Sequence, residues 1–164
     1  MTTDAQTIES TKNEFVRAKN GLLNIFAHTP DDRVNWSPAK TARTPVHLMV
    51  HAASAVRNLH HTMMGTPFPV PTPDEAEKYF RDEESHFSTR EQALEKFNSA
   101  CEDYEKWLDG LDASQLDTEV KMPFNFGQMP IRNVMVFPGF HTQWHQAQLE
   151  YLQTIYGDMD WHMG

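Results

Sequence analysis

Residues 140–157, FHTQWHQAQLEYLQTIYG, place two histidines four positions apart in a segment with helical periodicity. In an α-helix this spacing separates two side chains by roughly 40° around the axis and about 6 Å along it, so both imidazoles leave the same face. The same face carries an apolar stripe, which comprises Val134, Phe137, His141, Trp144, His145, Gln148, Leu149, Leu152 and Ile155. Unpaired buried polar groups cost on the order of 1 to 3 kcal/mol each. This helix must therefore fold against neighbours that satisfy its imidazoles, and a metal ion would satisfy them directly.

Three other stretches predict long helices, at about residues 4–27, 44–64 and 88–110, and the final helix is expected to start near residue 131. The second begins at Thr44 and Pro45, an N-cap followed by proline at the first helical position, where the missing N–H costs nothing. The third begins at a capping box formed by Ser88 and Glu91. The final helix contains Pro138, which we expect to bend it just before the two histidines.

The connections between these helices complete the predicted fold. Residues 66–87 hold four prolines and a dense run of charges, so we expect a long crossover with a short helix at 74–81. Residues 122–130 are compatible with a small hairpin or an extended pair. No segment alternates as a long strand does. The chain is therefore predicted to be all-α, a four-helix bundle in a single domain of residues 1–164, with the crossover between helices 2 and 3.

The charge balance and the cysteine count exclude several classes of protein. The chain has 14 Lys and Arg against 23 Asp and Glu, a net charge of −9, and no basic cluster, so nucleic acid and anionic membranes are not expected partners. It has no run of 18 apolar residues and starts with a polar, acidic segment, so we expect a cytoplasmic protein. Cys101 is the single cysteine, which excludes an internal disulfide and is more typical of a small core residue than of a nucleophile.

A third histidine extends the pair on the final helix to a candidate metal site. His51 lies on the shoulder of the apolar side of the second predicted helix and is the histidine of that helix expected to face inward. Together with His141 and His145 it would offer three neutral imidazoles, a set that suits zinc, nickel, copper or iron(II) and leaves at least one coordination position open. An open position is typical of a catalytic site, although the sequence identifies no catalytic acid or base.

The remaining histidines have simpler interpretations. His47 is one turn before His51 and further toward solvent, so it is either a surface residue or a fourth ligand that would close the site. His60 and His61 are adjacent and both expected on the exterior. The motif Glu83-x-x-His86 occurs once, in the crossover, whereas a di-iron carboxylate bundle needs two such motifs.

Three further residues are candidates for the surroundings of the site. Gln148 is either a hydrogen-bond partner of a ligand imidazole or a buried amide bonded to a neighbouring helix. Trp36 and Trp144 either line the mouth of a pocket or pack, Trp36 over one end of the core. No cluster of arginines is visible that would bind an anionic thiol.

The pattern of motifs resembles the DinB-like (YfiT-type) four-helix bundles over nearly the whole chain. The matching features are WSPAKTARTPVHLMVHAA, in which Trp36 and Pro38 lead to the Thr44 cap and to His51, and HTQWHQAQL, followed by Gly157. The resemblance implies an up-down-down-up bundle, a homodimer, and one divalent ion, zinc or nickel, bound by the three histidines. The chain departs from the family at Pro138-Gly139, and it has His-Gln-Ala-Gln where relatives often have His-Arg-Gly-Gln.

Members of that family include thiol-dependent S-transferases and isomerases that use bacillithiol or mycothiol, and metal-dependent hydrolases. The resemblance therefore implies a metal-dependent enzyme that transfers a low-molecular-weight thiol to small electrophilic molecules, in detoxification or stress. One alternative is a hydrolase that uses metal-bound water. The other is a non-catalytic bundle, in which the histidines are ordinary buried residues or form a metal clip that stabilises a dimer. The sequence leaves the substrate unidentified.

Overall fold

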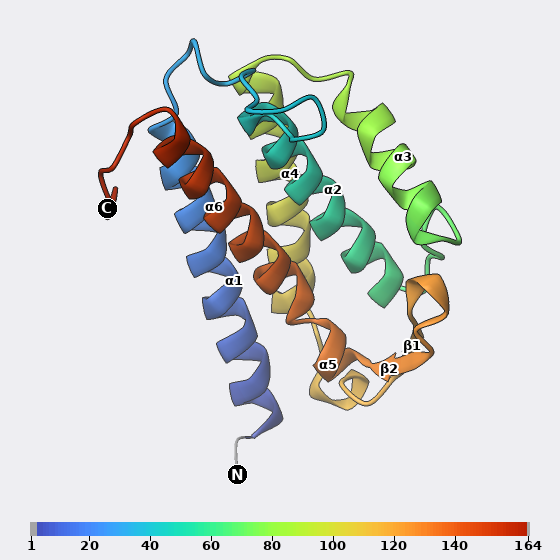
Figure 1. Cartoon of the computed structure of the whole chain (residues 1–164). Helices are drawn as coiled ribbons and strands as arrows, with labels where there is room; N and C mark the ends of the chain where they lie inside the picture. Colours follow the sequence, from blue (N-terminus) through green and yellow to red (C-terminus); the bar gives the residue numbers. More distant parts are fainter. Residues whose placement is uncertain (1–2, 164) are drawn as a thin grey trace.

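The computed structural model, which describes residues 3–163, is dominated by four long helices (Figure 1). These are α1 (Asp4–Ala27), α2 (Pro45–Met63), α4 (Arg90–Asp109) and α6 (Phe137–Ile155). α1 packs along α6, and α2 packs against both α4 and α6. The all-α class predicted from the sequence is confirmed. Because α2 touches α6 directly, the two helices that carry the candidate ligands are neighbours.

Shorter elements fill the connections. They are α3 (Pro73–Glu84), α5 (Ile131–Val134), the 3-10 turns η1 (Ala113–Gln115) and η2 (Pro123–Asn125), and the strands β1 (Glu119–Lys121) and β2 (Gln128–Pro130). The strands form an antiparallel pair in which Val120 pairs with Met129. The hairpin expected within residues 122–130 is therefore present but begins earlier, because its first strand is Glu119–Lys121. Within residues 3–163, no helix is both long and apolar enough to cross a membrane.

Threonine caps begin the long helices α1, α2 and α4. The Thr44 hydroxyl accepts a hydrogen bond from the His47 backbone N–H, and Pro45 occupies the first turn of α2, as predicted. The capping box of α4 lies one residue later than expected, because Thr89 rather than Ser88 is the N-cap and Gln92 completes the box. Each of these side chains satisfies a backbone N–H that has no partner inside the helix.

Two expected boundaries were wrong, and both affect the site. The crossover helix does not stop at residue 81 but continues to Glu84, its last residue. The final helix is not one bent helix, because the chain breaks at Met135 and Val136, between α5 and α6. Pro138 lies in the first turn of α6, where its missing N–H removes no helical hydrogen bond. α6 is therefore regular through both of its histidines.

The core lies between the long helices and also contains a histidine expected on the exterior. His60 is 6% exposed, and its ring lies 5.8 Å from the Tyr104 ring and 5.5 Å from the Trp107 ring, measured between centroids. The exterior prediction for His60 was wrong because α4 covers this side of α2. Cys101 is fully buried and burial raises the pKa of its thiol, as suits a core residue.

Candidate metal centre

Three histidines from two helices converge at the contact between α2 and α6. The ring centroid of His51 lies 5.4 Å from that of His141 and 4.9 Å from that of His145. The two rings on α6 are 4.5 Å apart. Each residue offers one ring nitrogen, and these three nitrogens lie within 4.8 Å of one another. Within residues 3–163 no other group of three His, Cys, Asp or Glu side chains is arranged in this way.

The arrangement fits a single ion after small side-chain movements. Zinc–imidazole bonds are about 2.0–2.1 Å long, so two nitrogens on one tetrahedral ion are about 3.3 Å apart. The widest separation in the triad, at most 4.8 Å, exceeds this by about 1.5 Å. Rotation of the imidazoles about their side-chain bonds covers such a distance without moving either helix.

Unpartnered ring nitrogens are the strongest sign that the triad is built for a ligand. His141 Nδ1 and His145 Nε2 are both buried and have no hydrogen-bond partner. Leaving a buried polar atom without a partner costs about 1 to 3 kcal/mol. Two such atoms side by side, on rings that face a third imidazole, are satisfied together by one cation.

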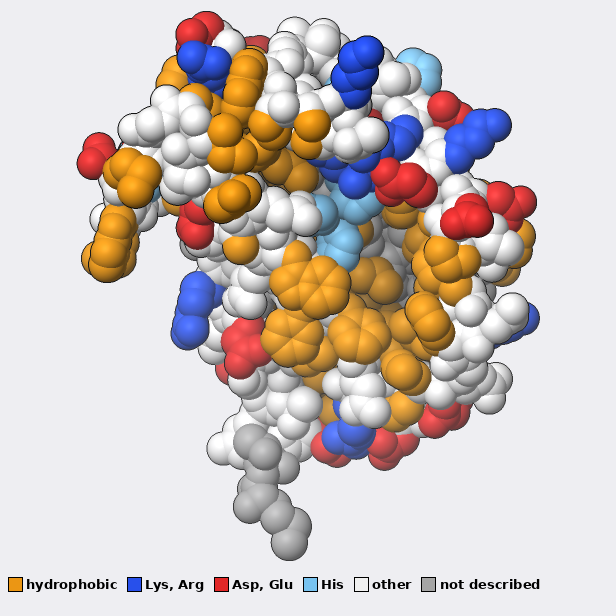
Figure 2. Space-filling view, in the orientation of Figure 1, with side chains coloured by type: hydrophobic (Ala, Val, Ile, Leu, Met, Phe, Trp, Pro, Cys, Tyr) orange, Lys and Arg blue, Asp and Glu red, His pale blue; other side chains and the backbone are white. Residues whose placement is uncertain are grey.

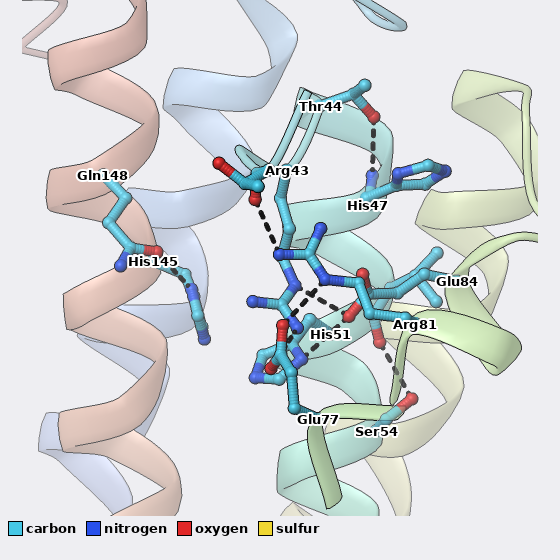
Figure 3. A network of polar contacts seen from close by, with 12 residues as sticks. Arg43, Thr44, His47, His51, Ser54, Glu77, Arg81, Glu84, His145 and Gln148 are labelled. Carbon is cyan, nitrogen blue, oxygen red and sulfur yellow. Dashed lines mark hydrogen bonds and ion pairs between the residues drawn. The ribbon is translucent and has the colours of Figure 1, made fainter. Parts of the chain in front are cut away.

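Two of the three imidazoles are oriented by hydrogen bonds from the ring nitrogen that faces away from the triad (Figure 3). His51 Nδ1 lies 2.9 Å from Glu84 Oε1, and His145 Nδ1 lies 2.8 Å from Gln148 Oε1. A carboxylate or amide oxygen only accepts hydrogen bonds, so Nδ1 donates in both pairs. This tautomer leaves Nε2 with a free lone pair, as a metal ligand requires.

Glu84 is the functional residue that the sequence analysis missed. Its side chain is 2% exposed, and Oε1 accepts hydrogen bonds from both His51 and Arg43, the latter from Nε at 2.8 Å. The charged run around residue 84 is typical of a solvated surface helix. The sequence analysis ended the predicted crossover helix at residue 81. Extending that helix by three residues would have included Glu84, which is the last residue of α3.

An ion-pair network extends from Glu84 along one side of the triad (Figure 3). Arg43 Nη2 donates to Glu77 Oε2 at 3.1 Å, and Arg81 Nε donates to Glu77 Oε1 at 2.7 Å. Arg81 also donates to the carbonyl oxygen of Thr41. The sequence shows no arginine cluster that would bind an anionic thiol, but the folded chain brings Arg43 and Arg81 together on Glu77 from segments far apart in the sequence.

The local electrostatics keep the α6 imidazoles neutral. Burial, and after it the nearby His51 and Arg43, lower the pKa of His141 to about 4. Burial is also the largest cause that lowers the pKa of His145 to about 3, and His141, His51 and Arg43 act in the same direction. Neutral imidazole is the form that binds metals, so both rings are ready to bind at neutral pH.

The site lies at the edge of the buried face of α6 rather than at its centre. Trp144 and Gln148, expected on the apolar stripe, are exposed, Trp144 to 66%. Figure 2 shows the histidines at the bottom of a hollow, with Lys or Arg side chains on one side and hydrophobic side chains on the other. The Phe80 ring lies 4.6 Å from His51 and the Trp144 ring 5.9 Å from His141. The triad therefore lies beneath this hollow, between charged and hydrophobic side chains.

The other candidates lie around the triad or away from it. His47 is half-buried and does not belong to the triad. Trp36 packs edge-on against Tyr156, just after the end of α6, at 5.7 Å between centroids. His162 stacks on His28 at 4.2 Å, near the C-terminal end of the described chain.

Comparisons with known proteins agree with this architecture. The sequence profile of the DinB superfamily matches residues 14–149. The chain is also similar to a protein from Streptococcus pneumoniae whose crystal structure was solved by a structural genomics consortium, with a TM-score of 0.64 and 14% identity, over 88% of this chain and 90% of that one. At this identity the likeness shows the fold alone. No curated protein gives a significant match.

Proposed function

Because this chain belongs to the DinB superfamily and brings three imidazoles to one point, we propose that it is a metal-dependent enzyme acting on small molecules. The pair of buried, unpartnered nitrogens on His141 and His145 is the observation that carries the proposal. Together with His51 they would hold one divalent ion, zinc or nickel. When bound, the ion would act as a Lewis acid that makes a thiol or a water molecule a better nucleophile at neutral pH.

The chain's own residues have separate tasks in this proposal. Glu84 and Gln148 fix the tautomer and orientation of two ligand rings. Packing of α2 against α6 buries the rings of His141 and His145 and lowers their pKa values, so that both are neutral at pH 7. The hollow admits the substrate from solution, between the charged side and the hydrophobic side (Figure 2).

The reaction we favour is the transfer of a low-molecular-weight thiol to an electrophilic small molecule, in a detoxification or stress role. This choice over hydrolysis rests on the resemblance to thiol-dependent DinB-like enzymes. A hydrolase that uses water is the alternative with the same site. A non-catalytic metal clip is the third possibility, and the open hollow beside the triad argues against it.

The proposal includes the family's architecture. We propose a single-domain, up-down-down-up four-helix bundle that works as a cytoplasmic homodimer. An exposed apolar row on α6 supports the dimer, since such rows often mark protein interfaces. Its members are Phe140, Trp144, Tyr151 and Ile155.

Metal analysis of purified protein tests the site. Wild type is expected to bind one equivalent of zinc or nickel, and His145→Ala to lose it. His61→Ala is the matched control, because His61 lies on α2 outside the triad and should retain the metal. Failure of the wild type to take up metal at any loading would end the enzyme proposal.

A second assay separates transferase from hydrolase. The metal-loaded protein is incubated with monochlorobimane and several low-molecular-weight thiols. Conjugation that depends on both metal and thiol supports the transferase. Turnover of electrophilic or ester substrates without added thiol would instead favour water as the nucleophile.

A further inference from the structure

The Arg43 guanidinium has a donor to spare beside the three histidines. Its side chain is 16% exposed, and two of its nitrogens are fixed by carboxylates, Nε by Glu84 and Nη2 by Glu77. Within residues 3–163 no acceptor is paired with the third nitrogen, Nη1. Because Arg43 is held at two points, the free N–H groups keep a defined direction.

A shared acceptor places this guanidinium at the triad, because Glu84 Oε1 accepts hydrogen bonds from both Arg43 Nε, at 2.8 Å, and His51 Nδ1, at 2.9 Å. In Figure 3 it lies next to His51 and on the side that faces His145. The spare donor is therefore close to the proposed metal site.

The charge balance around Arg43 favours a negatively charged ligand. In the network, the positive Arg43 and Arg81 are balanced by the negative Glu77 and Glu84. A divalent ion on three neutral imidazoles would leave two positive charges uncompensated. The site would then attract anions even though the whole chain carries a net charge of −9.

The triad also has apolar neighbours. The Phe80 ring packs against His51 and the Trp144 ring lies beside His141. Figure 2 shows hydrophobic side chains directly next to the histidines, across from the Lys and Arg side chains. A ligand that uses both sides has an apolar body and an anionic group.

We infer that the site binds small organic anions, and that Arg43 is the residue that selects them. Nη1 donates to one oxygen of a carboxylate, or of a similar anionic group, while the apolar part of the molecule lies along Phe80 and Trp144. An arginine suits this task because its planar donors match the geometry of a carboxylate. The inference rests on the proposed function, since the ion supplies much of the positive charge.

Binding of benzoate and of benzamide, its uncharged analogue, to the full chain tests this inference by titration calorimetry. Metal content is measured first for every variant. Metal-loaded wild type is expected to bind benzoate at least about tenfold more tightly than benzamide. Arg43→Gln should reduce this preference to about threefold or less. Arg81→Gln is the matched control, because Arg81 belongs to the same network through Glu77 and Thr41, and it should keep the preference.

Arg43→Lys keeps the charge but cannot bond Glu84, Glu77 and a ligand in the same planar geometry. It is therefore the test variant if Arg43→Gln does not fold. Its preference is expected to fall between those of wild type and Arg43→Gln. Equal binding of benzoate and benzamide to metal-loaded wild type overturns the inference and leaves the metal site standing. A preference that survives both Arg43 variants overturns the role of Arg43. If the wild-type protein binds no metal, both the proposed function and this inference are overturned.

Discussion

Replacing Glu84 by glutamine isolates the contribution of the carboxylate to the metal site. The change keeps the size of the side chain but removes the charge that accepts hydrogen bonds from His51 and Arg43. Hydrogen bonds to charged groups are about twice as strong as neutral ones. Loss of the partner of a ligand histidine typically lowers metal affinity by about 10- to 100-fold, or about 1.4 to 2.7 kcal/mol.

The stability of the metal-free protein should change as well. Glu84 Oε2 is buried and has no partner, so a glutamine amide placed there would be an unsatisfied donor, at about 1 to 3 kcal/mol. Arg43 keeps Glu77 as a partner. The loss should therefore stay below the 3 to 5 kcal/mol typical of an abandoned buried charge.

A competition titration against a chromophoric chelator measures the affinity, and circular dichroism checks that the variant is folded. Glu77→Gln is the matched control, because Glu77 pairs with Arg43 but does not touch His51, and its side chain is 54% exposed. It should bind metal within about threefold of wild type, as expected for an exposed ion pair worth about 0 to 1 kcal/mol. A Glu84→Gln protein that binds metal as tightly as wild type, or a Glu77→Gln protein equally weakened, would refute the role given to Glu84.

Three further predictions concern the second oriented ligand, the pH dependence and a helix contact. Gln148→Leu removes the acceptor of His145 Nδ1 and should lower metal affinity by about tenfold. The control Gln146→Leu loses only a hydrogen bond to Glu150 and should leave metal affinity unchanged. The same chelator titration measures both affinities. The pKa values of His141 and His145 are lowered from 6.5 to about 4 and about 3 in the folded protein. At a pH between these values and 6.5, the unfolded chain therefore binds more protons than the folded chain. The metal-free protein should therefore be most stable above pH 6.5 and lose stability as the pH falls toward 4, by up to about 1.4 kcal/mol per pH unit per histidine. Urea unfolding at pH 7 and pH 5 measures this, and equal or greater stability at pH 5 would contradict it. Gly21→Ala should stabilise α1 by up to about 1 kcal/mol, because only the flexible end of Gln146 meets the new methyl group; a clear fall in the thermal midpoint would show that this contact is rigid.

The residues that the sequence identified are those with a local signal. Thr44 and Pro45 mark the start of α2 by chemistry that acts within one helical turn. The spacing of His141 and His145 fixes their common face in any helix. The family resemblance, carried by the motifs around His51 and His145, is confirmed by the matching profile.

The features that the sequence did not identify depend on which segments meet. Glu84 and Arg43 lie 41 residues apart, and nothing in either local sequence indicates that they share a hydrogen bond. His60 is buried because α4 brings Trp107 over it. The apolar stripe predicted for α6 included Trp144 because helical periodicity gives a face but not the limits of what the neighbours cover.

Anomalous diffraction from crystals of metal-loaded protein tests the central claim most directly. The site described here predicts one strong peak between α2 and α6, about 2.0–2.1 Å from a ring nitrogen of each of His51, His141 and His145. A peak bound by other residues, or crystals of loaded protein with no peak between these helices, would contradict it.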